Sequence, residues 1–218
     1  MASIVVAGDT SGSITISAPL VAGSGTLTLP VATDTLVGKA TTDTLTNKSI
    51  AATQLTGTIA AARLPAGSVL QVVSTIKTNA FTTTSLTLVD VTGLSVSITP
   101  SSASNKVLVL VDVKVVTQTA VAGSGGSGVI LVRGATSLAV STAASVNFTG
   151  QLSGRNTGST ATTFTASVSY LDSPATTSST TYKIQGLVGA GTLFINTDED
   201  STAGVGSVST ITVMEIQG

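Results

Sequence analysis

Apolar and polar residues alternate with a period of two along much of the stretch 67–218. Successive side chains of a β-strand point to opposite faces of a sheet, so such a run predicts a strand with one buried face. The segments 94–99 and 162–170 follow this pattern. In the segment 106–116, valines from Val107 to Val115 fill one face, whereas the other carries two leucines followed by Asp112 and Lys114. This segment is predicted to be a central strand whose second face is only half covered.

Similar segments recur through this stretch, with turn-rich separators and without helical periodicity. β-Branched residues dominate the chain and strong helix formers are scarce, so that only residues 59–64 tolerate a helix. These features predict an all-β fold, an antiparallel β-sandwich of the jelly-roll kind. The predicted strands are 69–76, 85–91, 94–99, 106–116, 129–133, 145–149, 162–170, 181–187, 192–196 and 208–216.

The last predicted strand changes the phase of its alternation. Ile211 and Val213 would share one face, but Met214 and Ile216 would lie on the other. This shift indicates a β-bulge, or a strand buried on both faces, for instance at an interface between chains.

Residues 1–66 differ in composition from the rest of the chain, because all four Phe and both Tyr lie beyond them. Short alternating pieces occur, such as 13–17, and the phrase TDTL at 33–36 returns at 42–45. A segment so poor in large side chains cannot build its own core against the cost of ordering its backbone. It therefore either stays disordered or buries its Ile and Leu residues against other chains. Pro65-Ala66-Gly67 is the expected joint to the second part.

The composition removes most catalytic chemistry. With no His and no Cys, the chain has no Ser-His-Asp triad, imidazole base, thiolate nucleophile, zinc knuckle or disulfide. We expect no enzymatic activity and no cofactor or metal. Only 9% of residues are charged and the net charge is −1, so no basic surface for nucleic acid or an anionic membrane is expected. The longest apolar run, 107–116, is far short of the roughly 20 residues of a membrane span, and the first residues do not resemble a secretory signal.

Two motifs have a chemical and a structural interpretation. Gly123, Gly125 and Gly128 match the dinucleotide-binding pattern G-x-G-x-x-G, but a predicted strand follows where that site needs a helix, which favours a hairpin loop. The acidic run at 198–200 is a candidate Ca²⁺ or glycosidase site. The ligand spacing of a Ca²⁺ loop is missing, and a chain with no Trp and two Tyr is poor in the aromatic platforms of a sugar-cleaving cleft, which favours a solvated turn.

Several phrases of the sequence resemble one family. The stretch 31–73, with TDTLTNKSI and LTGTIAAARLPAGSVLQV, resembles the shaft and linker of bacteriophage tail-fibre proteins, including those of phages of cyanobacteria and marine bacteria. The upstream phrase ITISAPLVAGSGTLTLP is similar to the attachment region of such fibres. Downstream, the stretch 81–113, YLDSPATTSSTTYKIQG and the closing STITVMEIQG resemble a C-terminal knob.

This resemblance implies a homotrimer with an extended, intertwined N-terminal β shaft and a C-terminal β-sandwich knob. Residues 1–30 would attach to a baseplate, tail or capsid protein, residues 31–66 would form the shaft, and residues 67–218 would form the knob. Intertwining would also cover the apolar residues that the N-terminal part cannot bury alone. The residues expected against the three-fold axis are Leu27, Leu29, Leu36, Leu45, Ile50, Leu55 and Ile59.

The resemblance further implies a virion protein that adsorbs to a glycan or protein on the bacterial surface. Binding residues concentrate on loops held by a rigid scaffold, and the expected receptor contacts are therefore Arg155, Asn156, Asp198, Glu199 and Asp200. Two alternatives remain open at this point. One is a head fibre, neck fibre or capsid decoration protein with an architectural role. The other is a depolymerising tailspike, against which the composition argues.

Overall fold

In the computed structural model, the described residues are 3–7, 13–17, 49–51, 53, 57–118, 127–140, 161–198 and 206–218. The chain divides into two compact units, residues 1–56 and residues 57–218. In the first unit, β1 (Ser3–Ala7) pairs with β2 (Ser13–Ser17) as an antiparallel hairpin, which confirms a strand at 13–17. No helix among the described residues is long and apolar enough to cross a membrane.

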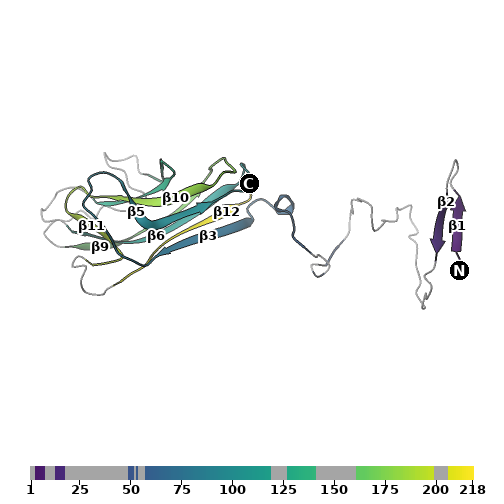
Figure 1. Cartoon of the computed structure of the whole chain (residues 1–218), viewed down its shortest axis with the longest axis horizontal. Coiled ribbons are helices and arrows are strands. Elements are labelled where there is room, and N and C mark those ends of the chain that lie inside the picture. Colours follow the sequence, from purple (N-terminus) through teal and green to yellow (C-terminus); the bar gives the residue numbers. More distant parts are fainter. Residues whose placement is uncertain are drawn as a thin grey trace. The chain divides into compact units, whose positions relative to one another are not determined.

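The second unit is an antiparallel β-sandwich (Figure 1), as the alternating sequence predicts. It begins with the 3-10 helix η2 (Ala61–Arg63), inside the segment that tolerates a helix. Its strands are β3 (Val69–Lys77), β4 (Phe81–Thr83), β5 (Val89–Ile98), β6 (Lys106–Gln118), β7 (Gly128–Arg133), β8 (Thr136–Leu138), β9 (Thr162–Asp172), β10 (Thr180–Leu187), β11 (Thr192–Ile195) and β12 (Ser209–Ile216).

The two layers of the sandwich are a four-stranded and a six-stranded sheet. The small sheet has the order β5-β10-β7-β8, and the large sheet has the order β3-β12-β6-β11-β4 with β9 added to β6. One edge of β6 pairs with β9 along almost its whole length, and the other edge pairs first with β12 and then with β11. β6 is therefore the central strand that its valine pattern predicts.

The core lies between the two inner faces. The five valines from Val107 to Val115 on β6 are all buried, whereas Leu108, Leu110 and the two charged residues opposite them are half-buried. These valines pack with the buried face of β5 from the small sheet and with the inner face of β9 from their own sheet. The alternation of 94–98, 106–116 and 162–170 is confirmed in each case.

Two details of the strand predictions are wrong. The predicted strands 85–91 and 94–99 are one strand, β5, which continues through an irregularity in its pairing with β10. Gly93, with φ of 80°, takes up the extra length there in a conformation that other residues rarely adopt. Residues 84–88 form a turn instead. The predicted strand 145–149 lies outside the described residues.

β12 places its apolar side chains on the two faces that the sequence predicts. Its inner face continues without a shift from Ile211 and Val213 to Glu215, which is only 1% exposed, and Met214 and Ile216 lie on the outer face. A pairing irregularity with β3 does occur between Glu215 and Ile216, at the end of the strand. The apparent shift of the apolar face thus arises because a carboxylate occupies an inner position.

Candidate functional site

The sandwich has two distinct ends. At the entry end, the Gly67 amide donates to the Gln217 carbonyl at 2.8 Å, and the Gln217 amide donates to the Ser68 carbonyl at 2.9 Å. The chain therefore enters and leaves the sandwich side by side. Strands β3 and β6 run from this end to the far end, where β3 finishes at Lys77 and β6 at Gln118.

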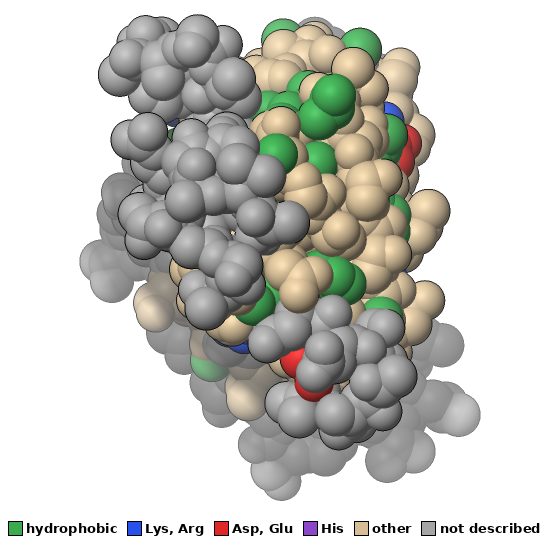
Figure 2. Space-filling view, turned by 90° about the vertical axis from the view of Figure 1, so that its left-hand side faces the viewer, with side chains coloured by type: hydrophobic (Ala, Val, Ile, Leu, Met, Phe, Trp, Pro, Cys, Tyr) green, Lys and Arg blue, Asp and Glu red, His purple; other side chains and the backbone are tan. Residues whose placement is uncertain are grey.

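The far end also carries the ends of the strands that flank the predicted receptor-contact segments. β9 begins there, because Thr162 pairs with Thr117 of β6, and β12 begins there, because Ser209 pairs with Lys77. Asp198 lies on the segment between β11 and β12. The described surface seen from this end (Figure 2) is mostly uncharged and polar, with few Lys, Arg, Asp or Glu side chains. Arg155, Asn156, Glu199 and Asp200 lie outside the described residues.

Hydrogen bonds around Asn196 fix the start of the segment between β11 and β12. Asn196 lies where β6 changes partner from β12 to β11, and its backbone adopts φ of 62°. Its amide donates to the Lys114 carbonyl at 3.1 Å, its side-chain Nδ2 donates to the Lys77 carbonyl at 2.8 Å, and Ser209 Oγ donates to its Oδ1 at 2.6 Å. Ser209 Oγ in turn accepts from the Lys114 amide at 3.0 Å. The buried Asn196 side chain thus provides hydrogen bonds where neither β11 nor β12 pairs with β6.

Asn196→Ala is expected to lower the free energy of unfolding by about 2–4 kcal/mol, because it removes buried hydrogen bonds and because alanine tolerates a positive φ less well than asparagine does. Asn196→Gly loses the same bonds without the backbone strain, so it should cost about 1 kcal/mol less. Urea unfolding followed by far-UV circular dichroism measures both, with exposed Thr92→Ala on β5 as the control. Equal losses for the two variants would contradict a contribution from strain.

Asp198 lines a hollow of about 210 Å³ near Asn196. Its other described lining residues are Lys114, Val115, Val116, Thr163, Phe164, Thr165, Thr197 and Ser207. Within the described residues, the buried Oδ1 atom of Asp198 has no hydrogen-bond partner. Lys114 Nζ lies 2.8 Å from Asp112 Oδ1 and donates to Thr165 Oγ1 at 3.1 Å. The hollow thus combines an acceptor, a cation, hydroxyl groups and one aromatic ring.

The residues expected at the three-fold axis are mostly outside the described part. Of the seven, the structure describes Ile50 and Ile59, which are 47% and 50% exposed in the single chain. Exposed isoleucines of this kind are available for contact with another chain. Leu27, Leu29, Leu36, Leu45 and Leu55 lie outside the described residues.

Two buried polar clusters hold the entry end, and the sequence analysis did not identify either. In the first, Asp172 at the end of β9 accepts from Arg133 Nη1 at 2.7 and 2.8 Å and from the Tyr182 hydroxyl at 2.6 Å. Arg133 and Tyr182 belong to the small sheet, so the cluster joins the two layers. Burial first, and the adjacent Asp172 second, raise the pKa of Tyr182 far above its usual value. Tyr182 therefore stays a neutral donor.

The second cluster surrounds Glu215. Its Oε1 accepts from the Ser101 amide at 2.6 Å, the Ser101 hydroxyl at 2.8 Å and Asn105 Nδ2 at 2.6 Å, and its Oε2 accepts from Gln71. Burial alone would raise the pKa of Glu215, but the hydrogen bonds from Asn105, Gln71 and Ser101 outweigh it and lower the pKa. Asn105 Oδ1 also accepts from the Gly218 amide, which ties the last residue to the cluster.

The position of Asp172 and Glu215 in the apolar–polar alternation indicates that both side chains are buried. Asp172 follows Phe164, Ala166, Val168 and Tyr170 at the same spacing of two, and Glu215 follows Ile211 and Val213 in the same way. A charged residue in the apolar phase of a strand is an inward-facing one. Lys77 at the end of β3 is also buried, but the alternation gives no such signal for it, because Gln71 and Thr75 share its phase. It is 2% exposed, donates to Asn79 Oδ1 at 2.7 Å, and burial lowers its pKa.

The motifs with a chemical interpretation contribute no reactive constellation to the described part. β7 begins at Gly128, so a strand follows the Gly-rich segment as expected. Among the described residues, no group of three or more His, Cys, Asp or Glu side chains is placed to hold a metal. Asp198 is the sole carboxylate among the described residues of its hollow, whereas glycoside hydrolysis uses two.

No family model and no curated protein matches the sequence. Among solved structures, chains of infectious bursal disease virus, strains Gt and Gx, each align with 68% of this chain at 14% identity, with TM-scores of 0.30 and 0.32. T=1 particles derived from the same virus give 14% identity over 68% of the chain and a TM-score of 0.29. The aligned part covers 38%, 41% and 36% of those chains. At such TM-scores the likeness carries no argument about function.

Proposed function

We propose that this chain is a structural protein of a bacteriophage virion, a homotrimeric tail fibre whose sandwich contacts the surface of the host bacterium. The observation that carries the proposal is the opposition of the two ends of the sandwich. Gly67 and Gln217 meet at the entry end, and the strand ends that flank the predicted contact segments lie at the far end. A fibre needs this polarity, since one end joins the shaft and the other presents loops.

The use of the buried polar groups supports a binding role without catalysis. Asp172 and Glu215 are each surrounded by donors that hold strands together, and both lie at the entry end. A general acid or base needs a free position for a substrate atom, and neither carboxylate lines one of the described hollows. We therefore infer that the chain works by its shape and its loops.

The hollow beside Asp198 supports a glycan as the bacterial ligand. Sugar hydroxyls both donate and accept hydrogen bonds, and here they would meet Lys114 and several hydroxyl groups that line the hollow. Phe164 supplies an apolar wall of the kind that packs against a sugar ring. A protein receptor is the other ligand class that adsorption assays would reveal.

Two measurements test the proposal. Light scattering of the full chain is expected to give three times the mass of the chain, and a monomer would overturn the trimer. Antibody raised against the sandwich is expected to label the tips of tail fibres on virions. Label over the head or neck would instead identify a head fibre, neck fibre or decoration protein, anchored through the same N-terminal part, and would overturn the adsorption role.

Replacing Asp198, Glu199 and Asp200 together with alanine is expected to reduce adsorption of the phage to its host at least tenfold, because it removes the acidic side chains of the predicted contact segment. The trimer mass should not change. Asp90→Ala, which breaks an exposed ion pair with Lys183 on the small sheet, is the matched charge-removing control. Equal adsorption by the triple variant and the wild type would exclude this segment from the contact.

A further inference from the structure

A row of apolar side chains crosses the outer face of the large sheet. The register places Val72 of β3 beside Met214, Met214 beside Leu108, and Leu108 beside Leu171 of β9. We call these four residues the apolar row. Val72 and Leu171 are 55% and 49% exposed, and the middle two are half-buried. Outer faces of sandwich sheets usually alternate to polar residues, so four adjacent apolar side chains there mark a contact surface.

The apolar character fades toward the far end of the same face. The next row contains Ser74, Thr212, Leu110 and Ser169, and the one beyond it contains Ile76, Thr210, Asp112 and Ser167. An open hollow of about 410 Å³ lies among these polar residues. In the other direction, exposed Val69 and half-buried Ile216 continue the apolar surface to the entry end. The surface is thus concentrated beside the point where residues 57–68 join β3.

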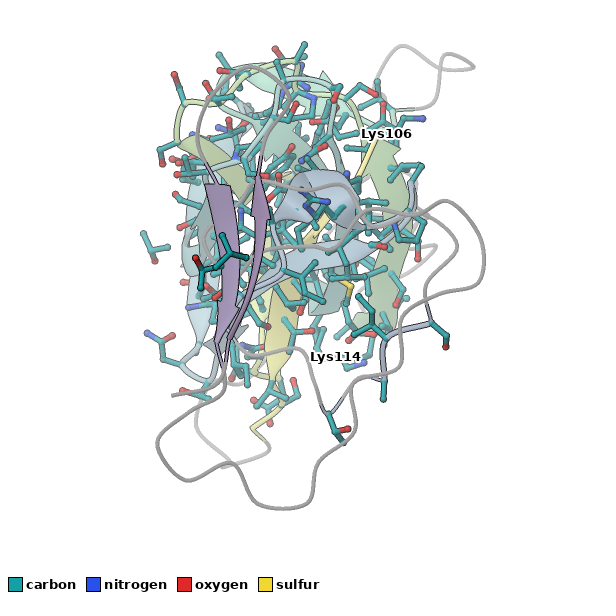
Figure 3. The ribbon with its side chains drawn as sticks, turned by 90° about the vertical axis from the view of Figure 1, so that its right-hand side faces the viewer. Lys106 and Lys114 are labelled. Carbon is teal, nitrogen blue, oxygen red and sulfur yellow. The ribbon has the colours of Figure 1, made fainter. Side chains whose placement is uncertain are left out.

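Charged side chains lie on both sides of the apolar row but not within it. Lys106 and Lys114, labelled in Figure 3, lie on the outer face of β6, one on each side of Leu108 and Leu110. Lys106 is exposed at the entry side, and Lys114 is paired with Asp112 at 2.8 Å on the other. Apolar centres with charged rims are characteristic of protein interfaces. The row itself contains no charged side chain that a contact would have to bury.

The outer face of the small sheet lacks such a row in its described strands β5 and β10. Asp90, Ser95 and Ser97 of β5 are exposed there, and they face Gln185, Lys183 and Thr181 of β10, with Lys183 and Gln185 both bonded to Asp90. Along β5 and β10 this face is therefore covered by polar side chains that water solvates well. On β7, Ile130 and Val132 lie on the same face, but they are only 4% and 2% exposed. Among the described strands, a row with exposed apolar side chains therefore lies on the outer face of the large sheet.

We propose that the apolar row is where the sandwiches of neighbouring copies of this chain meet. The inference rests on the proposed trimer and adds which surface of the sandwich faces the three-fold axis. Gly67 and Gln217 mark the entry end of the sandwich, so in a trimer joined through the chain before Gly67 the surface nearest that end is the one offered to its copies. The row spans four strands at about 4.8 Å spacing, roughly 15 Å across. A row of four side chains covers much less than the roughly 800 Å² per partner of a standard interface. The row would therefore add to a trimer contact that the N-terminal part also makes.

The absence of cysteine from the chain permits a direct test on the full-length protein. Leu171→Cys and Val72→Cys each place a single thiol in the apolar row, and Ser95→Cys places one on the outer face of the small sheet as a matched exposed control. A short bismaleimide is added to each, and covalent dimers are measured on denaturing gels. We expect at least tenfold more dimer from positions 171 and 72 than from position 95. Labelling with a monofunctional maleimide and a thermal melt show that each thiol is accessible and each variant folded.

The outcomes separate this inference from the proposed function. A trimer mass with strong cross-linking at 171 and 72 supports both. A trimer mass with no more cross-linking at these positions than at 95 would overturn the apolar row as the meeting surface and leave the trimer standing. A monomer mass in light scattering would overturn the trimer itself, and the row with it.

Discussion

Asp172→Ala is expected to lower the free energy of unfolding by about 3–5 kcal/mol, because it breaks a buried ion pair and leaves a buried hydroxyl without its acceptor. The Asp172 side chain is only 5% exposed, and Tyr182 is fully buried. Arg133 is 27% exposed and turns toward water at lower cost. Most of the lost free energy of unfolding therefore comes from the unpaired Tyr182 hydroxyl and from the lost contact between the layers. Urea unfolding by far-UV circular dichroism, at one fixed protein concentration, measures it.

Two matched variants divide this effect. Tyr182→Phe removes the hydroxyl but keeps the pair between Asp172 and Arg133, so it should cost about 1–2 kcal/mol. Asp90→Ala removes an exposed carboxylate whose side chain is 53% exposed, and it should cost at most about 1 kcal/mol. If Asp172→Ala costs no more than Asp90→Ala, the cluster does not hold the two layers together.

The fold was predictable from the alternation because the alternation records burial directly. β6 and β9 are long, and each has one continuous apolar face, so both were predicted, although each extends two residues beyond its predicted end. β4 and β8 have three residues each, too few for a period of two to be recognised. At Gly93 the alternation breaks within a single strand, and sequence alone does not distinguish this irregularity from a turn.

The candidate site was less predictable, because its geometry comes from residues distant in sequence. Asp198 was identified from its acidic neighbours, but its hollow also needs Lys114 and Phe164, which reach it from other strands. The clusters at Asp172 and Glu215 were not predicted, although both residues stand in the apolar phase of their strands. The donors that make such positions tolerable, such as Asn105 and Gln71, were not identifiable from sequence.

Glu215→Gln is expected to lower the free energy of unfolding by about 3 kcal/mol at pH 7. The carboxylate accepts hydrogen bonds at both of its oxygen atoms. The glutamine amide has only one accepting atom, so its NH₂ group would face donors that it cannot satisfy. Asp112→Asn is the matched control, since that carboxylate is 43% exposed and bonded to Lys114 and Ser167. It should cost at most about 1 kcal/mol.

The pH dependence separates the charge of Glu215 from its shape. The fold lowers the pKa of this carboxyl below the usual 4.5, so the unfolded chain binds more protons there than the folded chain does. Its contribution is therefore fully present above about pH 5 and is lost as the pH falls through the folded-state pKa. Asp90 and Asp112 have lowered pKa values too and contribute with the same sign. Wild-type stability should therefore fall steeply in acid, and less steeply in Glu215→Gln.

The difference between wild type and Glu215→Gln should accordingly narrow between pH 7 and pH 3, because the wild-type carboxyl becomes neutral and loses the same accepting capacity. Urea midpoints at the two pH values measure this difference, and Asp112→Asn should show a smaller change. A difference of about 3 kcal/mol that persists at pH 3 would mean that the charge is unimportant and that the shape of the side chain alone is required. Since Asn105 bonds both Glu215 and Gly218, acid should also release the last residues from the entry end, where the sandwich joins the rest of the chain.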